Sequence, residues 1–183
     1  MVQGRKSVEE HYALAKRGDW EPVLQAWQSD QRFAGGCSRY QNPFSGWTFL
    51  HQAARAGHEE ACCQLIRLGA AVHALTYADE SAHEIALKHH HHRLAILLKE
   101  ADLHEGRDSS WSPPRDAALL PSSNRWEEGQ ERRAAEPMRV AYGSAVITIP
   151  AGSRYYVDSF ERTLIGFHGT YDPPSDMGCG SLV

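Results

Sequence analysis

The sequence predicts a mainly α-helical protein with a short solenoid of helix-turn-helix units over residues 8–104. A flexible linker over 105–137 and a small antiparallel β module over 138–183 are expected to follow. Two observations support the helical part: a residue pattern recurs at a fixed period, and apolar residues recur at helical spacing on both sides of a turn. A third observation, the change to β-branched and aromatic residues after residue 137, predicts the β module.

The best-defined helix-turn-helix unit lies at residues 46–69, with the sequence GWTFLHQAARAGHEEACCQLIRLG. Thr48 is a hydroxyl residue of the kind that caps a helix N-terminus, and Gly57 can adopt the left-handed conformation that ends a helix. Apolar residues at three- and four-residue spacing then predict a second helix over 59–68. Leu65 is expected on the buried face of that helix.

The same pattern returns in the next unit, where Ser81 takes the place of Thr48. The segment from Thr48 to His58, TFLHQAARAGH, resembles the T-P-L-H-x-A-A-x-x-G-H signature of ankyrin repeats, with Phe49 in place of the proline. The interval between the two units also equals the period of this family, about 33 residues. The resemblance implies about three repeats over residues 8–104, whose fingers and first helices present a concave surface to a protein partner.

The units on either side depart from this pattern in two ways. Residues 8–29 resemble an amino-terminal ankyrin cap with its turn at Gly18. Because the interval from Gly18 to Gly57 is longer than the family's period, residues 30–45 are expected to form an enlarged finger. In the last unit, His90 takes the place of Gly57, so we expect it to adopt a left-handed conformation at some cost in free energy.

The tract His89–His92 raises the question of a metal site, since imidazole is a common ligand of transition metals. Four consecutive residues cannot all face one ion when the turn is folded, and no acid or cysteine lies nearby at a recognised ligand spacing. We therefore expect a solvated turn between two helices, with no metal and no other cofactor.

Residues 105–137 are rich in Ser, Pro and alternating charges and lack a sustained apolar period, which predicts a flexible linker. Two isolated tryptophans, Trp111 and Trp126, leave open a segment that docks on the repeats or on a partner. After the linker, three runs rich in β-branched and aromatic residues predict a three-stranded antiparallel meander.

The middle of the β module, SRYYVDSFERT, resembles the central strand and turn of a WW domain. The matching positions are Tyr155, Tyr156, Val157, Asp158, Arg162 and Thr163. The resemblance implies a surface that binds an extended or Pro-rich segment. Because about 45 residues alone bury only a small core, packing against the ankyrin repeats is the expected alternative.

Composition narrows the functional classes. The net charge is −4 and no segment is strongly basic, which argues against a nucleic-acid partner. The N-terminus lacks an apolar signal core, and no stretch is long and apolar enough for a membrane span. The adjacent residues Cys62 and Cys63 cannot easily bridge each other, which favours a reducing compartment. The sequence therefore predicts a cytoplasmic, or alternatively nuclear, protein without a membrane partner.

The sequence contains no glycine-rich phosphate loop, nucleophile elbow or pair of carboxylates on rigid elements, so catalysis has no candidate residues. It predicts instead a non-enzymatic adaptor for protein–protein interaction. The candidate partner-binding residues, chosen because their types and positions suit the concave surface, are Tyr40, Phe44, Trp47, Arg55, Tyr77, Lys88 and His89.

Two further hypotheses concern the C-terminal region. The ending Ser181-Leu182-Val183 resembles a class I PDZ ligand, which is captured through its carboxylate. The alternative function is a small ligand-binding protein or enzyme, in which the β module, with Tyr155 and His168, forms a pocket against the repeats.

Overall fold

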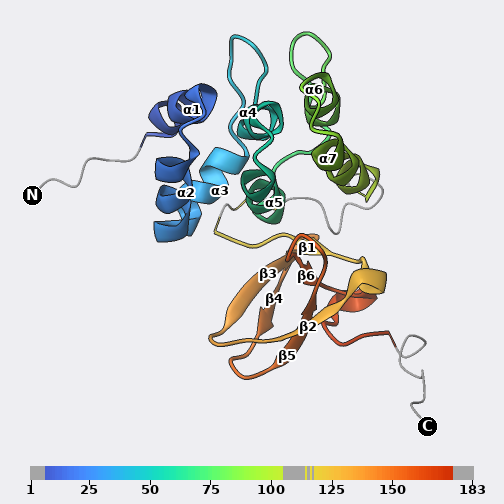
Figure 1. Ribbon diagram of the computed structural model, residues 1–183. Helices are drawn as coiled ribbons and strands as arrows, with labels where there is room; N and C mark the ends of the chain where they lie inside the picture. The colour runs from blue at the N-terminus through green and yellow to red at the C-terminus, as the bar shows by residue number, and fades with distance from the viewer. Residues whose placement is uncertain (1–6, 105–113, 115, 117, 175–183) are drawn as a thin grey trace, which may run out of the picture. The chain divides into compact units, whose positions relative to one another are not determined.

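The computed structural model describes residues 7–104, 114, 116 and 118–174. The chain divides into two compact units, residues 1–107 and 108–183. The first unit is helical and the second contains short β-strands (Figure 1). None of the helices in the described residues is long and apolar enough to cross a membrane.

The described part of the helical unit contains seven α-helices, most of which lie in two layers. Figure 1 shows α1, α4 and α6 side by side in one layer and α2, α5 and α7 in the other. In the first layer α4 packs against both α1 and α6, and each of these three helices also packs against the one that follows it in the second layer. The bounds are α1 Val8–Arg17, α2 Trp20–Ser29, α3 Gln31–Ser38, α4 Phe49–Ala56, α5 Glu59–Arg67, α6 Ala82–Lys88 and α7 His92–His104.

The central pair of helices, α4 and α5, begins and ends as the sequence predicts. Thr48 Oγ1 accepts a hydrogen bond from the backbone N–H of His51 at 3.3 Å, and Thr48 N donates to His51 Nδ1 at 3.0 Å. These two bonds form a capping box that satisfies free N–H groups at the start of α4. Gly57 ends α4 in the left-handed conformation, with φ 68°.

The hydrogen bonds of this turn recur in the next pair, α6 and α7. The backbone N–H of His58 donates to Ala53 O at 3.0 Å. At the corresponding place in the next unit, His91 N donates to Ala86 O at 2.9 Å. The left-handed conformation expected for His90 is confirmed by its φ of 64°.

The prediction of an enlarged finger over residues 30–45 is wrong, because half of that segment is the helix α3. Asp30 Oδ1 accepts a hydrogen bond from Phe33 N at 3.0 Å and caps this helix. Ala34 and Cys37, three positions apart, are buried on one face. The adjacent glycines in QRFAGGCS disfavour an isolated helix, so tertiary packing decides this element. The loop that remains spans residues 39–48.

The core of the helical unit combines aliphatic and aromatic side chains. Phe49, which stands where the ankyrin signature has proline, is fully buried. Its ring lies 5.3 Å from that of Tyr12, 5.7 Å from that of Trp27 and 6.0 Å from that of Tyr40. The aromatic contacts join α1, α2, the loop after α3 and α4 around one residue. Leu65 is fully buried on α5, as predicted.

The β unit is not the three-stranded meander that the sequence predicts. Its larger sheet has the strand order β1-β6-β5-β2, with β1 and β6 parallel, and β3 and β4 form a separate hairpin. The turn after β4 explains the difference, since Gly152 N donates to Ala134 O at 2.7 Å and Ala134 N donates to Ser153 O at 2.9 Å. These bonds direct the chain to β2 rather than back along β4. The bounds are β1 Ser122–Ser123, β2 Gln130–Arg133, β3 Met138–Tyr142, β4 Ala145–Ile149, β5 Arg154–Val157 and β6 Thr163–Leu164.

The described part of the predicted linker also belongs to this unit. Residues 122–133 contribute β1, the short 3₁₀ helix η2 (Trp126–Glu128) and β2. The ring of Trp126 lies 5.8 Å from that of Tyr156, so it packs within the β unit. All four side chains of β2 are exposed, which leaves no apolar alternation by which the sequence could have indicated a strand. Trp111 lies outside the described residues.

Candidate functional site

Two neighbouring loops of the helical unit are joined by hydrogen bonds at their tips. We call residues 39–48 finger 1 and residues 74–81 finger 2. Tyr77 N donates to Ser45 O at 2.9 Å, and Tyr77 Oη donates to Pro43 O at 3.2 Å. Gly46, with φ 72°, permits this close approach, because a Cβ there would lie 2.8 Å from Tyr77 N. The two fingers therefore form one connected surface.

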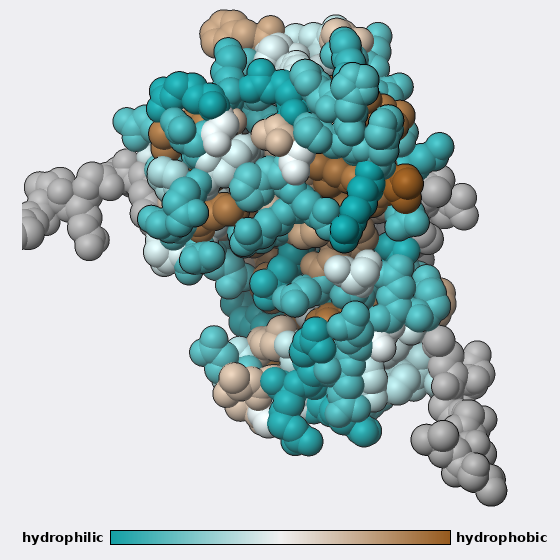
Figure 2. Space-filling model, in the orientation of Figure 1, coloured by the Kyte–Doolittle hydropathy of each residue, from teal (hydrophilic) through white to brown (hydrophobic). Residues whose placement is uncertain are grey.

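Three of the five large hydrophobic side chains that are exposed in the described part of the helical unit lie on these fingers, and the other two are Leu87 and Ile96. Phe44 of finger 1 is 90% exposed and Tyr77 of finger 2 is 67% exposed, and Leu75 adds to the same finger. Elsewhere on the face of the helical unit in Figure 2, hydrophobic surface forms small patches among hydrophilic residues. Large apolar side chains at loop tips, away from the core, are a feature of surfaces that bind partners.

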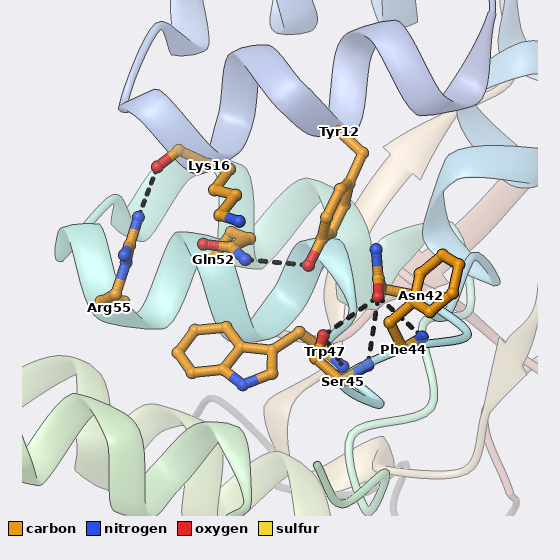
Figure 3. Close-up of a pocket in the computed structure, with 8 residues that line it drawn as sticks. All are labelled: Tyr12, Lys16, Asn42, Phe44, Ser45, Trp47, Gln52 and Arg55. Atoms are coloured by element: carbon orange, nitrogen blue, oxygen red, sulfur yellow. Dashed lines mark hydrogen bonds between the residues drawn. The ribbon is translucent and has the colours of Figure 1, made fainter. Parts of the chain in front are cut away.

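A pocket of about 370 Å³ lies where finger 1 meets α1 and α4. This volume is near the lower end of the range of about 300–1,000 Å³ for ligand-binding pockets. Its lining combines three aromatic residues, two cations and three uncharged polar residues. Figure 3 shows all of them: Tyr12, Lys16, Asn42, Phe44, Ser45, Trp47, Gln52 and Arg55.

The tip of finger 1 is shaped by the side chain of Asn42. Asn42 Oδ1 accepts hydrogen bonds from Phe44 N at 3.0 Å and from Ser45 N at 3.1 Å. Asn42 backbone O accepts a further bond from Gly46 N at 2.9 Å. This local turn leaves Phe44 at the edge of the pocket, and an asparagine is well suited to such a turn.

The floor of the pocket is a buried polar pair between two helices. Gln52 Nε2 on α4 donates to Tyr12 Oη on α1 at 2.9 Å, and both residues are buried. Burial raises the pKa of the Tyr12 phenol, so it stays protonated at neutral pH. Gln52 Oε1 accepts no hydrogen bond from the described residues. A buried acceptor left without a donor costs about 1–3 kcal/mol, so this atom lowers the stability of the α1–α4 contact.

The two cations of the pocket, Lys16 and Arg55, come from the neighbouring helices α1 and α4. Arg55 Nη2 donates to the backbone O of Lys16, which joins the ends of α4 and α1. The Arg55 guanidinium also lies 5.8 Å from the centre of the Trp47 ring, a cation–π arrangement. No Asp or Glu is among the residues that line the pocket, and none in the described part of the chain forms an ion pair with Lys16 or Arg55.

Three of the seven residues that the sequence nominated line this pocket, namely Phe44, Trp47 and Arg55. Tyr40, near the start of finger 1, is half-buried and packs inward, with its ring 5.1 Å from that of Tyr12. Tyr77 lies on finger 2, outside the pocket but joined to finger 1.

The remaining two nominated residues lie at the end of α6, away from the pocket. Lys88 Nζ is 2.8 Å from Glu80 Oε1, so its charge is partly used by an exposed ion pair. His89 is the exposed C-cap residue of α6. The structure does not bring either residue to the pocket.

Sequence reasoning missed three pocket residues that come from helices, namely Tyr12, Lys16 and Gln52. Tyr12 and Lys16 are four positions apart on α1, and Gln52 precedes Arg55 by three positions on α4, so each pair lies on one helix face. This spacing was the available signal. It could not reveal that the two faces meet, because that depends on the packing of α1 against α4.

The histidine tract is distributed over the turn between α6 and α7. His91 Nε2 lies 3.2 Å from Arg55 O, whereas the rings of His90 and His92 are 6.2 Å apart in an edge-on arrangement. Among the described residues, no group of three or more His, Cys, Asp or Glu side chains is placed to hold a metal ion.

Two other features singled out in the sequence are the C-terminal ending and the cysteines. Ser181–Val183, the PDZ-like ending, lies outside the described residues. Cys37 and Cys62 are free thiols in the core, and burial raises the pKa of Cys37 to about 11. A thiol with such a pKa is protonated and weakly nucleophilic at neutral pH.

Comparison with known proteins adds no assignment: no protein-family model matches the chain, and no curated protein matches it significantly.

Proposed function

We propose that the helical unit is a short ankyrin-repeat stack and that the protein is a non-enzymatic adaptor, which binds a protein partner through the pocket and the two fingers. The repeat assignment is supported by the capping box at Thr48 and by a second one at Ser81, the corresponding position of the next unit. It is supported also by the left-handed residues Gly57 and His90, which have the same separation. Helices of this kind hold loop tips on a packed scaffold.

One observation carries the binding proposal: exposed aromatic side chains lie on two connected fingers, one of which borders a pocket with a polar floor. Phe44 and Tyr77 are 90% and 67% exposed, so water surrounds most of each side chain. Aromatic residues of this kind supply much of the binding energy at protein interfaces, where a partner removes them from water. A partner that covers both fingers would bury this apolar area.

The proposal is tested by comparing two variants of the full chain that each remove an exposed phenylalanine. Phe44→Ser alters the finger surface, and Phe167→Ser, at a residue 69% exposed in the β unit, is the matched control. Proteins captured from cell extract by the unaltered chain are quantified by mass spectrometry alongside those captured by each variant.

We expect at least one captured protein to decrease about tenfold or more with Phe44→Ser and to be retained with Phe167→Ser, which corresponds to about 1.4 kcal/mol or more. That protein, once purified, should bind the unaltered chain directly in calorimetry. Identical sets of proteins captured by both variants would show that finger 1 is not the binding surface.

A further inference from the structure

We infer that the pocket receives an extended segment of the partner in which an Asp or Glu stands beside an apolar or aromatic residue. This inference rests on the proposed function and specifies the chemistry of the partner. It follows from the two cations in the pocket, the aromatic residues beside them and the exposed finger surface next to the pocket.

The charge of the pocket selects a carboxylate. Lys16 and Arg55 both line it, and its lining contains no Asp or Glu to neutralise them. The carbonyl of Lys16 and the ring of Trp47 hold the Arg55 guanidinium in place. Ligand binding therefore costs little further conformational entropy at this side chain. Arginine and lysine side by side bind a carboxylate through charge-assisted hydrogen bonds.

The walls next to the two cations select an apolar neighbour. Trp47 is half-buried beside Arg55, and Phe44 lies at the rim. Figure 3 shows the Trp47 ring below Gln52, on the side of the pocket where Arg55 also lies. An acidic side chain on the cations therefore places an adjacent residue of the same segment within reach of the aromatic rings.

The fingers favour a polypeptide over a small anion. The Gln52–Tyr12 hydrogen bond closes the floor and Gln52 Oε1 is itself buried, so the contacts of a ligand lie on the walls and the rim. Beyond the pocket, Tyr77 offers a further exposed aromatic side chain, which is bonded to finger 1 through Pro43 O. A segment about as long as the two fingers uses this whole surface, whereas a small anion uses only the two cations.

The experiment selects twelve-residue random peptides displayed on phage against the full chain and measures the winners by fluorescence polarisation. We expect enrichment of Asp or Glu next to an aromatic or aliphatic residue. A selected peptide should lose at least tenfold in affinity when its acidic residue becomes Gln, and at least tenfold with the variant Lys16→Glu. That variant should no longer distinguish the two peptides.

The matched control is Lys99→Glu, which reverses the charge of an exposed lysine on α7 and should change the affinity less than twofold. Circular dichroism of each variant checks that the helical unit is folded, and Lys16→Gln repeats the test without adding a negative charge. Selected peptides without acidic preference, or an affinity unchanged by both Lys16 variants, would overturn the inference.

The outcomes separate this inference from the proposed function. If peptides without acidic preference still lose affinity with Phe44→Ser, protein binding at finger 1 stands and only the acidic specificity is wrong. If the selected peptides are insensitive to Phe44→Ser as well, the proposed function fails too. If ATP, used as an anionic probe, binds in a manner that requires Lys16 while no peptide does, the pocket is a site for small anions and the inference is wrong.

Discussion

His51 illustrates how one residue serves both the start of a helix and the core. Its Nδ1 accepts the hydrogen bond from Thr48 N, which requires that this nitrogen carry no proton. Burial lowers the pKa of His51, and the backbone carbonyls of Glu80 and Ala74 offset this only in part. The neutral imidazole is therefore the form that the folded protein holds.

Acidification is expected to destabilise the helical unit through His51. The unfolded chain binds a proton at this residue near pH 6.5 and the folded chain binds it only at lower pH, so stability falls as the pH decreases below about 6.5. The contribution is up to about 1 kcal/mol between pH 6.5 and 5.5. Urea unfolding at several pH values measures it.

The variant His51→Gln provides the control, because glutamine at this position can still complete a capping box but does not titrate. We expect the stability of the variant to fall less than that of the unaltered protein over this interval. Parallel pH profiles for the two proteins would show that His51 is not the group responsible.

At the scale of the helix, the end of α4 depends on the absence of a side chain at Gly57. Its φ of 68° already favours glycine, and a Cβ there would lie 2.5 Å from the ring of His91. His91 Nε2 lies 3.2 Å from Arg55 O, so this ring is also held in place. Gly18 ends α1 with φ 92°, but a Cβ there would meet nothing within 4 Å.

These two glycines make a matched pair of substitutions. Gly18→Ala should lower the free energy of unfolding by only about 1–2 kcal/mol, the cost of holding alanine in the left-handed conformation. Gly57→Ala should cost about 1–3 kcal/mol more, since the His91 ring must also move. Thermal and urea unfolding followed by circular dichroism compare them. Equal losses of stability in the two variants would mean that the His91 ring moves aside at no cost in free energy.

Helix α3 is an element that the local sequence alone does not predict. Its capping residue Asp30 is readable in the sequence, but the Gly35-Gly36 pair argues against a helix. Ser38 Oγ donates to Leu68 O at 3.1 Å, and Cys37 is fully buried. These contacts with a segment distant in sequence stabilise a helix that its own residues would not maintain.

At the scale of the whole molecule, the division into two units predicts that the helical one folds alone. Each unit has its own core: Leu65 and its neighbours in the first, and Val140, Ile149 and Ile165 in the second. A fragment of residues 1–107 should remain helical and unfold cooperatively, because its neighbouring helices bury their apolar faces against each other. Circular dichroism and urea unfolding test it, and a random-coil spectrum would contradict it.

The sequence by itself determined the features that depend on neighbouring residues. Thr48 and Gly57 delimit α4 because capping and left-handed turns need only local hydrogen bonds and the right residue type. The periodic recurrence of this pattern located α6 and α7 for the same reason. The exposure of Phe44 could also be anticipated, since turn-forming residues flank it on both sides in the sequence.

Only the tertiary structure decided the features that depend on contacts distant in sequence. The Tyr12–Gln52 hydrogen bond spans 40 residues, and the bond from Arg55 to Lys16 O spans 39. Together they make the floor and the cationic side of the pocket, which neither helix predicts alone. In the β unit, pairing of β2 with β5 relies on backbone hydrogen bonds rather than on an apolar pattern, so residues 130–133 looked like a linker. Periodicity reports which face of an element is apolar, but it does not report which element that face will meet.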